Sequence, residues 1–167
     1  MRNKYLVLFS MSGILVVVDQ YTKLMVSLHI PLNYSVKVIE DFFNLTHIRN
    51  SGVAFGLFAS EQSEYKALMF VTISAIAIMA ILVIFHQTPK EKKMVQTGLI
   101  LIFSGAIGNL IDRSLHGEVI DFVDFFIKGY HFPAFNIADS CITIGVALMV
   151  IDLFSGESNP DSSANAL

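Results

Sequence analysis

Two aspartates, each next to a long apolar run, are the residues of this chain best suited to chemistry. Asp121 lies in the segment VIDFVD, and Asp139 lies in the segment FNIADS. Keeping an ionisable side chain close to hydrocarbon is costly, so such a residue indicates a functional site. Two neighbouring carboxyl groups share one proton and can act as general acid and general base toward a water molecule. The sequence therefore predicts acid–base activation of water at a membrane boundary.

The composition of the chain is typical of an integral membrane protein. Of its 167 residues, 54% are hydrophobic and 15% are charged, whereas a soluble domain carries about 25% charged residues. The net charge of -3 and the lack of a basic stripe argue against a nucleic-acid partner. The single cysteine, Cys141, allows neither an intramolecular disulfide nor a cysteine metal site.

Four apolar segments approach the length of about 20 helical residues that crosses a bilayer. All four prolines fall outside these segments, as expected for helix interiors. No small-residue cleavage site follows the first apolar run, so we expect that run to be a retained span and not a signal peptide. The prediction is one membrane-embedded domain, residues 1–154, with spans at 5–25, 65–85, 94–111 and 138–154, and a disordered cytoplasmic tail, residues 155–167.

The basic residues next to the spans predict the orientation of the protein. Arg2 and Lys4 precede the first span, and three lysines lie between the second and third spans, within residues 90–93. The positive-inside rule makes that side cytoplasmic, so we expect both termini in the cytoplasm. Residues 27–64 and 115–135 then form outward-facing segments, and the two aspartates meet near the outer membrane face.

The first outward-facing segment carries a pattern typical of β-strands. Val36 and Val38, and then residues 45–49, alternate in character with a period of two. We therefore expect a small sheet on the membrane surface. The segment NSGVAFG at residues 50–56 favours a turn, and its alternative use is a close-approach surface for an extended peptide.

Other polar residues near the spans each allow a structural and a functional interpretation. Asp19 and Lys23 share a helix face, either as an ion pair or as a snorkelling pair that closes the first span. Asn109, Asp112 and Arg113 project from one side of the third span, and they either end that span or offer arginine donors to a carbonyl or a lipid phosphate.

The fourth span begins with a pattern that serves both a helix and a site. Asn136 and Asp139 have the spacing of a reciprocal helix cap. Asp139 also gains from the positive end of the helix dipole. A capping role for Asp139 is therefore compatible with a catalytic one.

Three competing functions differ in what the acidic residues would do. Asp112, Glu118, Asp121 and Asp124 carry the oxygen donors that magnesium prefers, as in membrane enzymes that transfer phosphoalcohol groups. The glycine- and arginine-containing spacing of those enzymes is absent, so this alternative ranks below hydrolysis. The second competing function is a transporter or channel subunit with a proton relay. The third is an assembly factor whose polar residues hold helices together.

Five short motifs give the chain a resemblance to the lipoprotein signal peptidases (signal peptidase II), the aspartyl peptidases of bacterial membranes. In order, they are DQYTK from residue 19, NSGVAFG from residue 50, GAIGNLIDR from residue 105, VIDFVD from residue 119 and FPAFNIADS from residue 132. The match extends over the whole length except the tail. One departure is Val53, where many relatives carry a second small residue.

The resemblance implies a mainly α integral membrane fold, with four transmembrane helices and a small outward-facing β-cradle, in the bacterial inner membrane. It implies cleavage of prolipoproteins just before a diacylglyceryl-modified cysteine, by a monomer that needs neither metal nor cofactor and whose partners are these precursors and membrane lipids. The implied roles are catalysis by Asp121 and Asp139, substrate binding by Asn50, Asn109, Arg113 and Asn136, and support by Asp19, Lys23 and Asp112.

Overall fold

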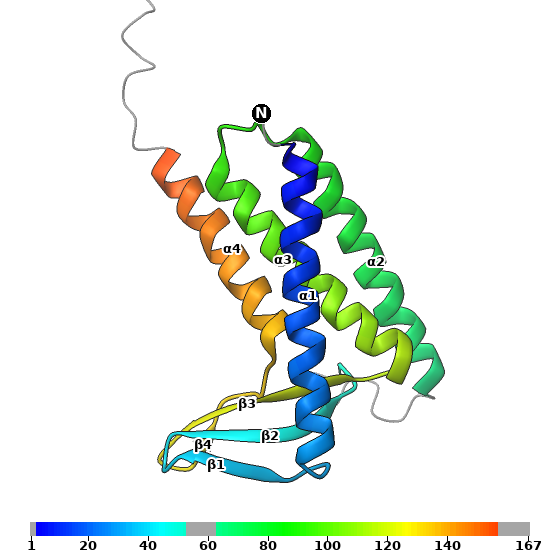
Figure 1. The fold of residues 1–167 in the computed structure, drawn as a ribbon, viewed down its shortest axis with the longest axis vertical. Coiled ribbons are helices and arrows are strands. Elements are labelled where there is room, and N and C mark those ends of the chain that lie inside the picture. The colour runs from blue at the N-terminus through cyan, green and yellow to red at the C-terminus, as the bar shows by residue number, and fades with distance from the viewer. Residues whose placement is uncertain (1–2, 53–62, 157–167) are drawn as a thin grey trace, which may run out of the picture.

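The computed structural model describes residues 3–52 and 63–156, which form four long helices and a four-stranded sheet (Figure 1). Each of these helices is long and apolar enough to cross a membrane. The predicted fold class, a membrane protein with four spans and a small sheet, is confirmed. The helices are α1 (Lys4–His29), α2 (Ser63–Gln87), α3 (Lys93–His116) and α4 (Ile137–Gly156). Arg2, Val53 and most of the predicted tail lie outside the described residues.

The helices end where the local sequence stops supporting them. α1 continues to His29, beyond the predicted span, and Pro31 follows it closely. α3 continues to His116, and Gly117 closes it in the left-handed conformation, with φ 74° and its N–H donating to the carbonyl of Arg113. These extensions carry α1 and α3 past the apolar region and into contact with the sheet.

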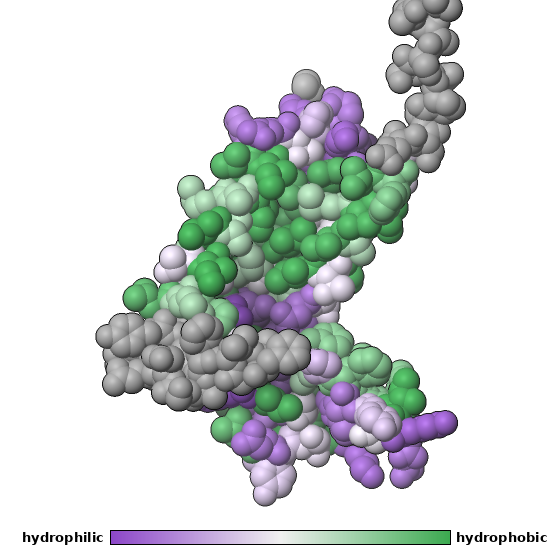
Figure 2. Space-filling model, turned by 180° about the vertical axis from the view of Figure 1, so that it is seen from behind, coloured by the Kyte–Doolittle hydropathy of each residue, from purple (hydrophilic) through white to green (hydrophobic). Residues whose placement is uncertain are grey.

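The bundle and the sheet occupy opposite ends of the molecule. The start of α1, the α2–α3 connection and the end of α4 lie at one end, and the sheet lies beyond the other end of the helices (Figure 1). Figure 2 shows a hydrophobic band over the helices and hydrophilic side chains at the end away from the sheet. A second hydrophilic zone lies between the helices and the sheet. The orientation of this arrangement in a membrane stays a prediction.

The core of the bundle forms around α3, which packs against α1, α2 and α4. Buried apolar side chains of α1, α2 and α3 make up its main cluster. α3 and α4 approach closely through glycines: a Cβ built on Gly98 would lie 2.7 Å from the carbonyl oxygen of Gly145. Such small-residue contacts allow two membrane helices to pack backbone to backbone. The middle of α4 therefore packs directly on the first turns of α3, and Gly105 makes the same kind of contact with Ala138 at the start of α4.

The sheet is antiparallel, with strand order β1-β2-β3-β4. The prediction of strands in the first outer segment is confirmed, whereas the second segment supplies strands that were not predicted. Phe122 of β3 packs against Val26 of α1 and against Ile30, which follows α1, so the extended end of α1 lies on the sheet. The strands are β1 (Ser35–Ile39), β2 (Phe43–Asn50), β3 (Val119–Ile127) and β4 (Tyr130–His131).

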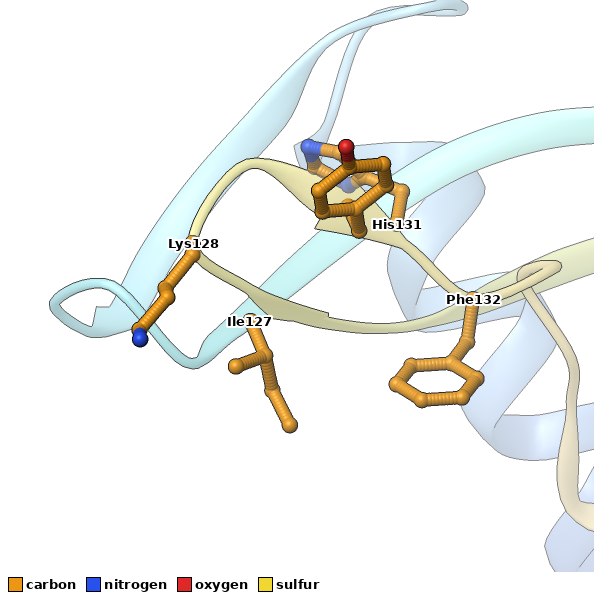
Figure 3. A pocket seen from close by; sticks show the side chains of 5 residues that line it. Ile127, Lys128, His131 and Phe132 are labelled. Atoms are coloured by element: carbon orange, nitrogen blue, oxygen red, sulfur yellow. The ribbon is translucent and has the colours of Figure 1, made fainter.

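The tip of the β3–β4 hairpin carries a pocket that is separate from the aspartates. Lys128 and Gly129 turn the chain with positive φ values of 50° and 84°. Ile127 and Phe132 project to the same side of the hairpin and line the pocket (Figure 3). Neither predicted catalytic residue lines it, so this pocket does not mark the candidate site.

Candidate functional site

The two predicted catalytic aspartates meet in the polar zone between the helices and the sheet. Asp121 comes from β3 and Asp139 comes from the first turn of α4. Asn136 links them, because its side-chain nitrogen donates to Asp121 Oδ1 at 2.8 Å and its backbone N–H donates to Asp139 Oδ2 at 3.2 Å. One residue therefore fixes the positions of both carboxyl groups.

The helix cap predicted at the start of α4 is present in its reciprocal form. The Asp139 N–H donates to Asn136 Oδ1 at 2.9 Å, and the Asn136 N–H donates to the Asp139 carboxylate. This arrangement satisfies backbone donors that a helix start leaves free. The cap uses one oxygen of Asp139, and the other accepts a 2.8 Å hydrogen bond from the Asn109 side chain.

Asp121 is held from the sheet side by Asn50, at the end of β2. The Asn50 side-chain nitrogen donates to Asp121 Oδ2 at 2.9 Å. Its oxygen accepts from the Gly52 N–H at 2.8 Å, and Gly52 adopts a φ of 79°. The described part of the 50–56 segment is thus the turn that its sequence favours. This turn orients the amide that holds Asp121.

The surroundings of Asp121 favour its neutral form. Its side chain is 2% exposed, and this burial raises the pKa of Asp121 to about 6. The negative charge of Asp139 also raises the pKa, whereas the hydrogen bonds from Asn50 and Asn136 and the charge of Lys23 lower it. Asp121 can therefore gain or lose a proton close to neutral pH, as an acid–base group requires.

A second, fully buried ionic network lies directly behind the pair. The Lys23 ammonium forms ion pairs of 2.8 Å with both Asp19 and Asp112, and it donates to Asn109 Oδ1 at 3.2 Å. Lys23 is 2% exposed, so it does not snorkel toward water. The ion-pair interpretation of Asp19 and Lys23 is therefore correct, and Asp112 completes it.

This network positions both segments that carry the candidate catalytic residues, β3 and the start of α4, through backbone hydrogen bonds. Asp19 Oδ1 accepts from the N–H of Ala138, next to Asp139, at 2.8 Å. Asp112 Oδ2 accepts from the N–H of Ile120, next to Asp121, at 3.2 Å. Each buried carboxylate thus fixes the backbone immediately before one candidate catalytic residue. The supporting role expected for these residues has a direct geometric basis.

Two further residues, Gln20 and Gly108, complete the network, and no role was predicted for Gln20. The Gln20 side-chain nitrogen donates to Asp112 Oδ1 at 2.8 Å and to the carbonyl of Gly108 at 3.2 Å. A Cβ on Gly108 would lie 2.6 Å from Asp19 Oδ2, so glycine is needed where α1 meets α3. The role of Gln20 could have been inferred from its position next to Asp19 in the first motif, DQYTK.

Arg113 borders the site and has a hydrogen-bond donor that is not in use within the described part of the chain. Its guanidinium lies 5.3 Å from the ring centroid of Phe70 on α2. Its Nε is buried and has no hydrogen-bond partner among the described residues. The charges of Asp112, Asp121 and Asp139 all act on it. The arrangement suits a planar donor held ready for a carbonyl or another anionic group.

The acidic residues offered as magnesium ligands do not converge. His131 Nδ1 lies 2.8 Å from Asp124 Oδ1, and the Asn44 side-chain nitrogen donates to Asp124 Oδ2 at 3.1 Å. Asp112 is engaged by Lys23. Across residues 3–52 and 63–156, no group of three or more His, Cys, Asp or Glu side chains could hold a metal ion. The geometry favours the hydrolytic interpretation over the phosphotransferase one.

Comparisons with known proteins show which chains this one is similar to. The family model described as signal peptidase (SPase) II matches residues 11–155. A lipoprotein signal peptidase of Desulforapulum autotrophicum is 46% identical over 139 residues, 83% of this chain and 86% of that protein. One of Syntrophus aciditrophicus is 44% identical over 152 residues, 90% and 94% of the two chains. A solved bacterial membrane enzyme structure has a TM-score of 0.81 and 37% identity, covering 93% of this chain and 92% of that one.

Proposed function

This chain belongs to the signal peptidase II family, and from that premise we propose that it is an aspartic endopeptidase with Asp121 and Asp139 as its catalytic dyad. It is a multi-pass membrane protease that removes signal peptides from prolipoproteins, cleaving just before the lipid-modified cysteine. Family membership gives the reaction and not the groups that perform it. The dyad assignment therefore rests on the geometry of this chain.

The observation that carries the assignment is the double hydrogen bond from Asn136. Its side chain holds Asp121 and its backbone N–H holds Asp139, so the two carboxyls face one shared donor residue. Two carboxyls held by one donor residue cannot both ionise easily, so the pair keeps one proton to a higher pH than an isolated carboxyl does. A retained proton beside an ionised partner is the state that acid–base hydrolysis needs.

The surroundings favour different roles for the two aspartates. Burial raises the pKa of Asp121 to about 6, so Asp121 is the better holder of the shared proton. Asp139 accepts from Asn109 and lies at the start of α4, where donors and the helix dipole stabilise a negative charge. We assign Asp121 as the general acid and Asp139 as the general base. As with any coupled pair, the measurable titration belongs to both groups together.

The reaction then proceeds by proton transfers through the pair. Asp139 takes a proton from water while the water oxygen attacks the carbonyl carbon of the scissile bond. Asp121 gives its proton to the carbonyl oxygen, which forms a neutral tetrahedral intermediate. The carbon–nitrogen bond breaks as Asp139 passes its proton to the leaving nitrogen and Asp121 recovers the hydroxyl proton. The products are a carboxylic acid and an amine, and the dyad regains its starting state.

The residues assigned to substrate binding divide into two kinds. Asn50, Asn109 and Asn136 already donate to the dyad, so their first task is to orient the carboxyls. Arg113 has a buried Nε without a partner among the described residues. We propose that Arg113 donates to the substrate backbone or to the ester carbonyls of its lipid. A guanidinium offers five donors and suits such a task.

The placement of the protein also follows from its charged residues. We propose that it functions as a monomer in the bacterial inner membrane, with both termini in the cytoplasm and the dyad near the outer face. Lys90, Lys92 and Lys93 lie at the end of the bundle away from the sheet, which favours that end as cytoplasmic. The donors Asn50, Asn109 and Asn136 belong to the same chain as the dyad, which supports the proposal of a monomer.

The experiment that tests this function uses a synthetic precursor peptide with a diacylglyceryl-modified cysteine. The purified protein should cut it at one bond, with a single pair of product masses, and should leave the unlipidated peptide intact. Cleavage should persist in EDTA, because the dyad needs only water and two carboxyls. Loss of cleavage in EDTA with recovery on added magnesium would support metal chemistry instead.

A further inference from the structure

The end of the bundle away from the sheet carries a groove that the proteolytic site does not use. The groove lies between the first turns of α1 and the start of α3. Its rim is polar and basic, with Lys90, Lys93 and Thr97 exposed. Its depth is apolar and is formed by Val7 and Ile100. None of the residues that line it is acidic.

Hydrogen bonds fix the basic rim of this groove in place. The Lys4 ammonium donates to the carbonyls of Phe85, His86 and Thr88 at 3.1, 2.8 and 3.0 Å, which satisfies the free end of α2. The Gln96 side chain donates to the carbonyl of Pro89 at 2.6 Å. The turn that carries Lys90 is therefore tied to both α1 and α3.

The lysines of this region are not equally available. Lys4 is engaged with three carbonyls, although its charge still adds to the local potential. Lys92 lies 3.7 Å from Asp152 of α4, in a partly exposed ion pair. Lys90 and Lys93 remain on the rim of the groove, with no ion pair to any described residue. They place two positive charges beside the apolar part of the groove.

We propose that this groove binds one anionic phospholipid of the adjacent leaflet. The phosphate lies against Lys90 and Lys93, and one acyl chain follows Val7, Met11 and Ile100 into the hydrocarbon layer. The rim stands at the ends of two spans, where headgroups lie, and the apolar residues follow at acyl-chain depth. Basic pockets between transmembrane helices are suited to acidic headgroups. A free phosphate would leave the apolar part of the groove uncovered.

A bound lipid would add contacts between elements that hydrogen bonds already connect at this end. It would contact α1, α3 and the turn after α2 together. A ligand that binds only the folded state stabilises it by mass action. We therefore expect the anionic lipid to raise the melting temperature without taking part in the cleavage.

The test uses the full chain in detergent, with phosphatidylglycerol, phosphatidylcholine or inorganic phosphate added, and native mass spectrometry to count bound lipid. Phosphatidylglycerol should bind and raise the melting temperature, whereas the other two should not. The double change Lys90→Gln and Lys93→Gln should weaken binding about thirtyfold, since each lysine near an anionic headgroup contributes about a factor of five. The matched control, Lys37→Gln with Lys128→Gln on the sheet, should bind normally.

A further variant tests the apolar half of the site without altering charge. Met11 is 40% exposed in the groove, and Met11→Trp should block the acyl chain and abolish phosphatidylglycerol binding. Peptide cleavage in detergent should stay at the unmodified level in all these variants, which shows that they are folded. The proposal fails if phosphatidylcholine binds equally, if phosphate alone stabilises equally, or if the groove variants bind like the sheet control.

Discussion

Two pairs of aspartates lie in the polar zone between the helices and the sheet, and different side chains hold them. Asp19 and Asp112 are both paired at 2.8 Å with the ammonium of Lys23, which is 2% exposed. Asn136 holds the other pair: its side-chain amide donates to Asp121, and its backbone N–H donates to Asp139. An ammonium compensates the charge of a carboxylate, whereas an amide only orients it.

Because of this difference, Asp19 and Asp112 form a supporting pair, whereas Asp121 and Asp139 form a reactive pair of the same residue type. Around Lys23, the carboxylates of Asp19 and Asp112 are both held in ion pairs with one ammonium. Around Asn136, burial raises the pKa of Asp121 to about 6. The support also fixes the reactive pair, since Asp19 holds the N–H of Ala138 and Asp112 holds the N–H of Ile120. Changes in the two pairs should therefore have different consequences, for activity in one and for folding in the other.

The largest expected effect on rate comes from the reactive pair. Asp121→Asn and Asp139→Asn should each lower kcat/KM roughly 1,000-fold, because an amide cannot exchange the proton that the mechanism moves. The double variant should cost little more, since the two groups act as one unit. Rates are measured on the lipidated peptide and divided by the amount of folded, inserted protein.

Asp124→Asn is the matched control for these changes. Asp124 is an acid on β3, as Asp121 is, but its carboxylate contacts His131 and Asn44 and not the dyad. It should retain most of the activity per folded molecule. Asp139 also caps α4, so a purely structural role predicts reduced folded protein with normal turnover. Substantial turnover per folded Asp121→Asn or Asp139→Asn protein would sink the dyad assignment.

Changes in the supporting pair should lower the stability of the protein more than the catalytic rate of the molecules that fold. Lys23→Met leaves two buried carboxylates without their counter-charge, which costs about 3–5 kcal/mol. We expect a lower melting temperature and less inserted protein than for any dyad variant. Removing the charges together, as Asp19→Asn, Lys23→Met and Asp112→Asn, should recover part of the lost stability. A Lys23→Met protein of normal stability and no activity would instead make Lys23 part of the chemistry.

The charges of aspartates from both pairs act on Arg113, and its replacement should show an intermediate effect. Arg113→Lys keeps the charge but loses the planar donors and the contact with Phe70. Loss of one charged hydrogen bond to substrate predicts a decrease in kcat/KM of about 10- to 100-fold. The folded amount should be unchanged. If the Arg113→Lys variant and the unmodified protein have equal kcat/KM, Arg113 only supplies a charge that ends the third span.

The smallest effect concerns pH and distinguishes the roles within the reactive pair. Folding raises the pKa of Asp121, so its favourable contribution to stability is present at low pH and is lost as the pH rises through about 6. If Asp121 is the acid, kcat/KM should fall over the same range, because the shared proton is lost. Asn50→Ala removes a hydrogen bond that lowers this pKa, so the fall should move to higher pH. A rate that rises through pH 6 would make Asp121 the base.

The sequence by itself determined the features that depend on neighbours along the chain. Apolar runs of membrane length predicted the four helices, because hydrocarbon requires internally satisfied backbone. The spacing of Asp19 and Lys23 offered their ion pair as one of two interpretations, and the spacing of Asn136 and Asp139 predicted the cap. Each of these contacts spans three or four residues within one helix or at its start. Local spacing is sufficient to predict them.

The tertiary structure alone decided the contacts between segments far apart in the chain. β3 was not predicted as a strand, because buried residues on both of its faces leave the run from Val119 to Phe122 without alternation. Asp112 joins Lys23 only because α1 and α3 pack together at Gly108. Asn50 reaches Asp121 only through the pairing of β2 with β3. The proton affinity of Asp121 follows from that burial, which no local pattern encodes.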